Sequence, residues 1–298
     1  VNIEEELSLY IDEHLDNCLQ NFESFSDRFD IIKEEPSTRS FVTETGVVIR
    51  VDMPLQLTST STEFQQDIPY FVGELDVALA ETYQLAEKLA RNQSAYGFVD
   101  AATLNLINVF SGLEEDLLPP FSANSLGREN TRWVTPVVKE KLQYEVLPFL
   151  NFMQLVNAQN YDPIVIDDTS EYAPYGAGIY RMMELRIDDQ LYPFNVNFVY
   201  PYSDIYLNIN NGEQLLESES TDNWVTRIAG MFFEKYSFKY DLSFPVLVKI
   251  EDPNAFKGEG WEFWIALEAN IVDNVPVLAN ESYSFYQGSN SINIDDEL

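Results

Sequence analysis

Four side chains that carry oxygen ligands gather around one short loop between two strand-like segments. They are Asp252, Asn254, Glu259 and Glu262. Carboxylate and amide oxygens are the ligands that Ca²⁺ prefers. Their spacing departs from that of an EF-hand loop, and an acidic hairpin end without metal is the alternative interpretation. Calcium is the one cofactor that the residues suggest, and we expect no other.

The single histidine and the single cysteine of the chain, His14 and Cys18, lie four residues apart on an apolar helical stripe. A helix with this spacing can offer two ligands to a metal ion. The chain has no second histidine or cysteine, so we expect a hydrogen-bonded core histidine and a buried thiol instead. A disulfide at Cys18 would need a partner outside this chain.

Motifs of several enzyme classes are absent. Ser-His or Cys-His catalysis would have to use His14, which we expect to be buried. No phosphate loop or dinucleotide fingerprint occurs, since Gly176 and Gly178 precede no helix start. A pair of carboxylates for glycoside hydrolysis carries no specific signal, because 50 acidic residues produce any spacing by chance. The sequence therefore favours a protein that is not an enzyme.

Trp264 and two glycosylation sequons are weaker signals. Trp264 lies on the polar phase of its strand, where an exposed ring beside carboxylates would favour glycan binding. A second core on that face is the alternative. The sequons begin at Asn92 and Asn280 and matter only in an exported protein.

The composition narrows the partners and the compartment. The chain has 298 residues, 45% of them hydrophobic, and a formal net charge of −33. A surface this acidic repels phosphate, so nucleic acid is not expected as a partner. Two compatible explanations of the acidity are adaptation to high salt and a location on a cell surface. No apolar run has membrane-spanning length, and because the first residue is Val1 we expect a portion of a longer protein.

The clearest element is an antiparallel hairpin over residues 236–271. Apolar residues fall on even positions from Tyr236 to Ile250, and the alternation resumes in opposite phase from Trp261. This period of two is typical of strands with one buried face. Phe244, Val248, Phe263 and Leu267 are therefore expected in the core.

The remaining elements alternate between helix and strand. An amphipathic helix is expected over residues 3–22, then short strands to residue 58, with Pro54 at a sheet edge or a bulge. Helices are expected from Leu75, from Asp100 as N-cap to Gly112, and from Thr135 to Pro148, with a long loop at 117–130. Further short strands lie between residues 152 and 233.

These elements predict an α+β fold of mainly antiparallel sheets, with an N-terminal amphipathic helix, a helical middle and a sandwich-like C-terminal half. We expect an α+β region at 1–150, an antiparallel β domain at 151–279 and a polar tail at 280–298.

Parts of the chain resemble a known family. The runs are YSFKYDLSFPVLVKIED (236–252), WEFWIALEANI (261–271), NVP (274–276), EELSLYIDEHLDNC (5–18) with Phe22, and residues 47–57. They are similar to uncharacterised surface proteins of small-genome (DPANN-type) archaea. The resemblance implies an extracellular region behind one N-terminal transmembrane anchor, and no catalytic residue.

Together these observations predict a non-enzymatic archaeal cell-surface protein that acts in adhesion, cell–cell contact or filament assembly. Its partners would be other proteins, further copies of itself or glycans. The alternative is a secreted carbohydrate-active enzyme or a glycan-binding module.

Overall fold

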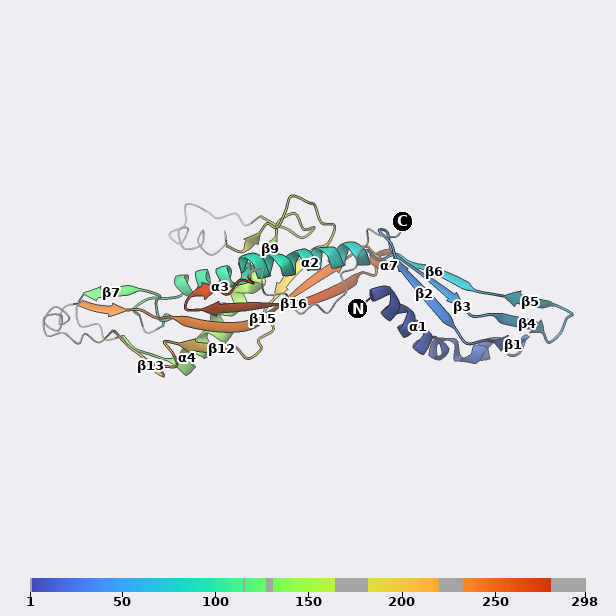
Figure 1. The fold of residues 1–298 in the computed structure, drawn as a ribbon, viewed down its shortest axis with the longest axis horizontal. Coiled ribbons are helices and arrows are strands. Elements are labelled where there is room, and N and C mark those ends of the chain that lie inside the picture. Colours follow the sequence, from blue (N-terminus) through green and yellow to red (C-terminus); the bar gives the residue numbers. More distant parts are fainter. Residues whose placement is uncertain (1, 115, 127–130, 164–181, 220–232, 280–298) are drawn as a thin grey trace. The chain divides into compact units, whose positions relative to one another are not determined.

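The computed structural model describes residues 2–114, 116–126, 131–163, 182–219 and 233–279 (Figure 1). The protein is α+β, with 31% helix and 35% strand in mainly antiparallel sheets, as the sequence predicted. It has two compact units, one containing Val1–Gln84 and Asp252–Trp261 and the other Leu85–Glu251 and Glu262–Asn280. This division does not follow the boundary that we expected at residue 150. The hairpin end joins the first unit because Ala255 packs with Val47 and Val77.

The first unit begins with helix α1 (Ile3–Leu19) and the 3₁₀ segment η1 (Gln20–Phe25). The side chain of Asn2 caps α1 by accepting a hydrogen bond from the Glu4 backbone N–H at 3.1 Å. Three acidic residues follow in the first turn, where they suit the helix dipole. The apolar stripe packs on a buried cluster of Val51, Met53 and Leu55, to which it contributes Ile11, Leu15 and Leu19.

The expected burial of His14 and Cys18 is wrong, because both side chains are exposed. Both residues lie next to the stripe of Ile11, Leu15 and Leu19 that packs on the sheet. Because a single layer of strands covers only one side of a helix, these neighbouring positions stay exposed. The His14 ring stacks on Tyr10 with centroids 4.2 Å apart, and its Nδ1 is hydrogen-bonded to the Tyr10 carbonyl at 2.8 Å.

Six strands of the first unit form two three-stranded antiparallel sheets, in the orders β1-β4-β5 and β2-β3-β6. The strands are β1 (Phe29–Lys33), β2 (Ser37–Val42), β3 (Val47–Asp52), β4 (Leu55–Ser59), β5 (Gln65–Ile68) and β6 (Phe71–Leu75). The consecutive strands β1 and β2, β3 and β4, and β5 and β6 thus each contribute one strand to each sheet.

A proline lies at each of the three junctions between these sheets, namely Pro36, Pro54 and Pro69. Proline has no N–H for the ladder, so strand pairing stops there. The expected edge position of Pro54 is wrong, because Pro54 joins β3 and β4, which are the central strands of the two sheets. The outer strands are β1, β2, β5 and β6.

The helical middle is composed of α2 (Leu79–Tyr96), α3 (Phe98–Val109), α4 (Thr135–Lys141), the π segment η2 (Leu142–Val146) and the 3₁₀ segment η3 (Leu147–Phe152). Three expectations were wrong in detail. Leu75 ends strand β6, so the first helix starts later, and the N-cap of α3 is Gly97 at φ 57°, with Asp100 as the third residue of the helix. The expected loop 117–130 contains strand β7 (Ala123–Leu126).

A five-stranded sheet dominates the second unit, in the order β11-β15-β16-β17 with β12 paired to β15 as well. Its strands are β11 (Asn195–Val199), β12 (Tyr206–Ile209), β15 (Tyr240–Asp252), β16 (Trp261–Val272) and β17 (Val275–Pro276). Three two-stranded pairs accompany it, β7 with β14 (Phe233–Tyr236), β8 (Trp133–Val134) with β13 (Leu215–Leu216) and β9 (Gln154–Leu155) with β10 (Glu184–Leu185). The predicted hairpin is therefore present and starts at Tyr240.

One face of this sheet is the core of the second unit. Every even residue of β15 is buried, and Phe244, Val248 and Leu267 are 2%, 0% and 5% exposed, as predicted, while Phe263 is half-buried. Helix α3 lies beside β15 and β16 (Figure 1) and is tied to the sheet by Asp100, whose Oδ1 accepts from the Asn270 N–H at 2.7 Å. The other face, which we call the outer face, is the candidate site.

Candidate functional site

The outer face of β15 and β16 presents polar and aromatic side chains. On β16 these side chains are exposed, and on β15 they are half-buried. The β16 set is Glu262, Trp264, Ala266, Glu268 and Asn270, and the β15 set is Ser243, Pro245, Leu247 and Lys249.

Pro245 marks the place where β15 changes its neighbour. β12 pairs with β15 as far as Ser243, and β11 pairs with it from Leu247 onward. Because Pro245 has no N–H to donate, it is tolerated where no strand pairs with it. The chain between β11 and β12 leaves the sheet at this point.

Helix α4 and segment η2 hold that connecting chain in place. The Gln143 amide Nε2 donates to the Ser203 carbonyl at 3.0 Å, and the Lys139 ammonium lies 2.7 Å from Asp204 Oδ1. The hydrogen bond from Lys139 lowers the pKa of Asp204. The ion pair with Lys139 therefore favours the charged form of the exposed Asp204 carboxylate.

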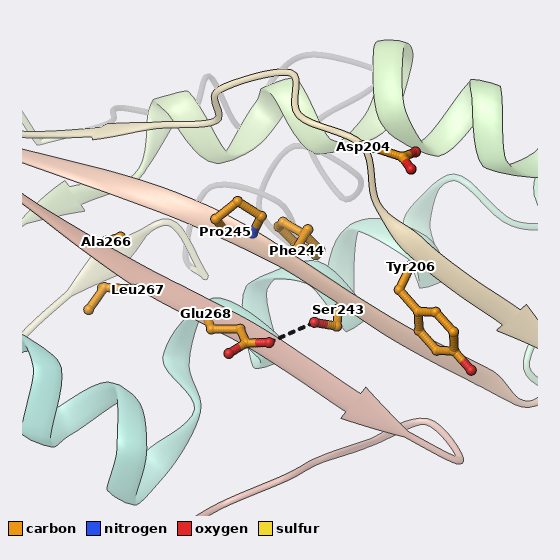
Figure 2. Close-up of a pocket in the computed structure, with 8 residues that line it drawn as sticks. All are labelled: Asp204, Tyr206, Ser243, Phe244, Pro245, Ala266, Leu267 and Glu268. Carbon is orange, nitrogen blue, oxygen red and sulfur yellow. Dashed lines mark hydrogen bonds between the residues drawn. The ribbon is translucent and has the colours of Figure 1, made fainter. Parts of the chain in front are cut away.

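The result is an open hollow of about 530 Å³ on the outer face (Figure 2). It is lined by Asp204, Tyr206, Ser243, Phe244, Pro245, Ala266, Leu267 and Glu268. The Ser243 hydroxyl donates to Glu268 Oε1 at 2.8 Å, and Tyr206 is the register partner of Ser243. Tyr206, Ser243 and Glu268 thus form one row across three strands.

Trp264 lies on β16 of the same face and is 47% exposed, so it belongs to no second core within the described part of the chain. Its indole N–H donates to Glu262 Oε2 at 3.3 Å, and Glu262 Oε1 in turn lies 3.0 Å from the Lys249 ammonium. The hydrogen bond between Lys249 and Glu262 lowers the pKa of the carboxyl and raises that of the ammonium. The Trp264 ring is therefore bonded through its N–H to a charged pair, and about half of the residue is exposed.

Chemically, the outer face combines aromatic rings, hydroxyls and carboxylate oxygens, and hydrogen bonds join Ser243 to Glu268 and Trp264 to Glu262. Such a surface suits binding, since aromatic faces pack on apolar groups and the oxygens accept hydrogen bonds.

Two of the four calcium candidates, Asp252 and Glu262, bind other groups of the protein, and the calcium site stays a prediction. Asp252 is buried, and its oxygens accept from the Asn254 N–H at 3.0 Å and from the Ala78 N–H at 3.4 Å, just ahead of α2. Glu259 contributes its backbone N–H to the end of the short helix α7 (Ala255–Gly258). Glu262 belongs to the second unit, where Lys249 and Trp264 hold it. Among the described residues, no three His, Cys, Asp or Glu side chains are grouped to hold a metal ion.

The other candidates of the sequence lie apart from the outer face. Asn92 is half-buried on α2, and its amide donates to the Lys88 carbonyl at 2.9 Å. Asn280 lies outside the described residues, as do the segments 164–166 and 224–232 and the polar tail. Cys18 is exposed, and its disulfide to an outside residue stays a prediction. None of the helices described is both long enough and apolar enough to cross a membrane.

Sequence reasoning identified Trp264 and missed the row of Tyr206, Ser243 and Glu268. Tyr206 stands on the polar phase of its strand, as Trp264 does, and that signal would have revealed it. Pro245 inside a long strand was a second signal, because a central strand tolerates proline only where pairing is interrupted.

Comparisons with protein-family models, with curated proteins and with solved structures find no match for this chain.

Proposed function

We propose that this chain is a non-enzymatic binding protein of an archaeal cell surface, and that it acts in adhesion or cell–cell contact through the outer face of its C-terminal sheet. The observation that carries the proposal is the exposed Trp264 ring, whose N–H is already bonded to Glu262. Tryptophan is among the residues that most often carry the binding energy of a contact surface.

Two features of the sequence support a place outside the cell. The runs at 236–252 and 261–271 resemble archaeal surface proteins, and the net charge of −33 suits a surface in contact with salt.

Assembly into filaments is a second mode of action, and strand β6 favours it. β6 is an outer strand of its sheet, and all five of its residues are exposed. An outer strand offers unpaired N–H and C=O groups to a neighbouring chain. If this edge joins copies of the protein, Val72→Lys should block self-association in light scattering, because a charged residue on an edge strand opposes pairing.

Immunolabelling of cells that produce the full-length protein tests the location. We expect antibody against this chain to label intact cells. Label that appears only after permeabilisation would contradict a surface protein.

A further inference from the structure

The two exposed rings of the outer face, Trp264 and Tyr206, offer aromatic surface on which a sugar ring can stack. Trp264 and Tyr206 are 47% and 60% exposed. The C–H groups on one side of a pyranose ring form an apolar patch that packs flat on an aromatic face. The indole N–H of Trp264 already donates to Glu262 at 3.3 Å, so we expect a ligand to contact the ring through its apolar surface.

The spacing of the site fits a chain of sugars better than a single sugar. Glu268 follows Trp264 by four residues on the same face of β16, which is about 13 Å along a strand. Tyr206 lies in the same row as Glu268, two strands away. A ligand that touches both rings must therefore extend across the hollow.

The charges favour a neutral ligand. Asp204 is paired with Lys139 and Glu262 with Lys249, so neither carboxylate needs a cation from a ligand. Glu268 accepts a hydrogen bond only from the Ser243 hydroxyl among the described residues, and its second oxygen Oε2 is left to accept from a ligand hydroxyl. An anionic ligand would be repelled by a chain of net charge −33.

We propose that the outer face binds a neutral glycan chain, which stacks on Trp264 and Tyr206 and donates hydroxyl hydrogen bonds to Glu268. This inference names the ligand class of the surface proposed above and rests on that function. A lysine-rich peptide, whose cations would sit over Trp264, is the competing ligand.

A printed array of neutral glycans, followed by calorimetry with the bound oligosaccharide, tests the proposal. We expect binding whose Kd changes by less than about twofold between 0.1 and 1 M NaCl, since no charge is exchanged. Trp264→Ala should weaken binding by about tenfold or more, the usual effect of removing a central aromatic contact. Tyr96→Ala, which removes a 72% exposed ring from the end of α2, is the matched control and should leave the Kd unchanged.

Glu268→Gln separates the two ligand classes. The amide oxygen can still accept from Ser243, and the amide N–H can donate to the oxygen of a sugar hydroxyl, so glycan binding should fall by no more than about threefold, whereas an oligolysine probe would lose a charge partner. Absence of binding to every neutral glycan on the array, equal affinity of Trp264→Ala and wild type, or binding of oligolysine alone would each overturn the inference. Glycan hydrolysis that Glu268→Gln abolishes would instead identify an enzyme.

The outcome also separates this inference from the proposed function. Protein that adheres to intact cells without binding any array glycan contradicts the glycan and leaves adhesion standing. Protein that binds glycans but labels only permeabilised cells contradicts the surface location.

Discussion

At the residue scale, the orientation of Trp264 depends on the ion pair behind it. Lys249 lies between Glu251 and Glu262, at 3.5 and 3.0 Å. Glu262 in turn accepts the indole N–H of Trp264. The ring is therefore coupled to the charge of a carboxyl that it touches.

Protonation of Glu262 should be visible in the emission of Trp264. The hydrogen bond from Lys249 lowers the pKa of Glu262 below its ordinary value of 4.5. The stabilising contribution of the Glu262 carboxylate is thus present above pH 4.5 and is lost as the pH falls through the lowered pKa. In Lys249→Met the emission change should move up toward pH 4.5. The difference spectrum between the wild type and Trp264→Phe isolates this signal, and an unchanged midpoint in Lys249→Met would contradict the coupling.

The exposure of single residues could be predicted where it follows from the strand period alone. It could not be predicted where it depends on how the element packs against its neighbour. Trp264 stood on the polar phase of β16, and its exposure followed from that phase. His14 and Cys18 lay near the apolar stripe of α1, but the width of the sheet beneath the helix decides which flank is covered. The sequence of the helix alone does not determine how wide the sheet beneath it is.

At the element scale, α3 is joined to β16 through a buried polar network. Gln93 donates to Asp100 Oδ2 at 2.5 Å and accepts from the Val99 N–H at 3.0 Å, while Asp100 Oδ1 accepts from Asn270. Burial raises the pKa of Asp100 above its ordinary value of 3.8. Gln93 also donates to the Glu268 carbonyl at 2.8 Å, so the network fixes the backbone of the strand that carries Trp264 and Glu268.

Asp100→Asn should change the pH dependence of stability. Because the folded pKa is raised, the contribution of Asp100 is complete below pH 3.8 and declines as the pH rises through the folded pKa. The free energy of unfolding of the wild type, measured relative to Asp100→Asn, should therefore fall with rising pH across this window. Denaturant titrations between pH 3 and 7 measure it, with the exposed Asp30→Asn as a control for the lost charge. A constant difference would show that Asp100 has an ordinary pKa.

Truncating the core beneath the hollow should destabilise the second unit strongly. Phe244 is 2% exposed and meets the Tyr200 ring edge-on at 5.9 Å. Phe244→Ala should lower the free energy of unfolding by about 3–5 kcal/mol. Phe152→Ala, which removes a ring that is 57% exposed, is the control and should cost far less. Equal losses in the two variants would mean that the strand phase assigned to β15 is wrong.

The hairpin could be predicted because every even position of β15 from Tyr240 to Ile250 is apolar, although Pro245 and Leu247 interrupt the polar phase. Strands β5 and β6 could not, because nearly all of their residues are exposed and no apolar period distinguishes them. The helix from Thr135 was predicted as regular, yet it changes to π and 3₁₀ geometry where Pro148 interrupts its hydrogen bonds.

At the scale of the whole molecule, the net charge of −33 acts on every element at once. The charge-screening length falls from about 10 Å at 0.1 M salt to about 3 Å at 1 M. Repulsion among carboxylates should therefore weaken, and the melting temperature should rise with added sodium or potassium chloride. Scanning calorimetry from low to multimolar salt measures this. A flat profile would show that self-repulsion does not limit stability.

The central claim, that the outer face of the C-terminal sheet is the contact surface, is tested most directly by binding of the purified chain to intact cells. We expect saturable binding that Trp264→Ala weakens by about tenfold or more, as removal of a central aromatic contact does, and that the control Tyr96→Ala leaves unchanged. Equal binding of Trp264→Ala and wild type would contradict the claim.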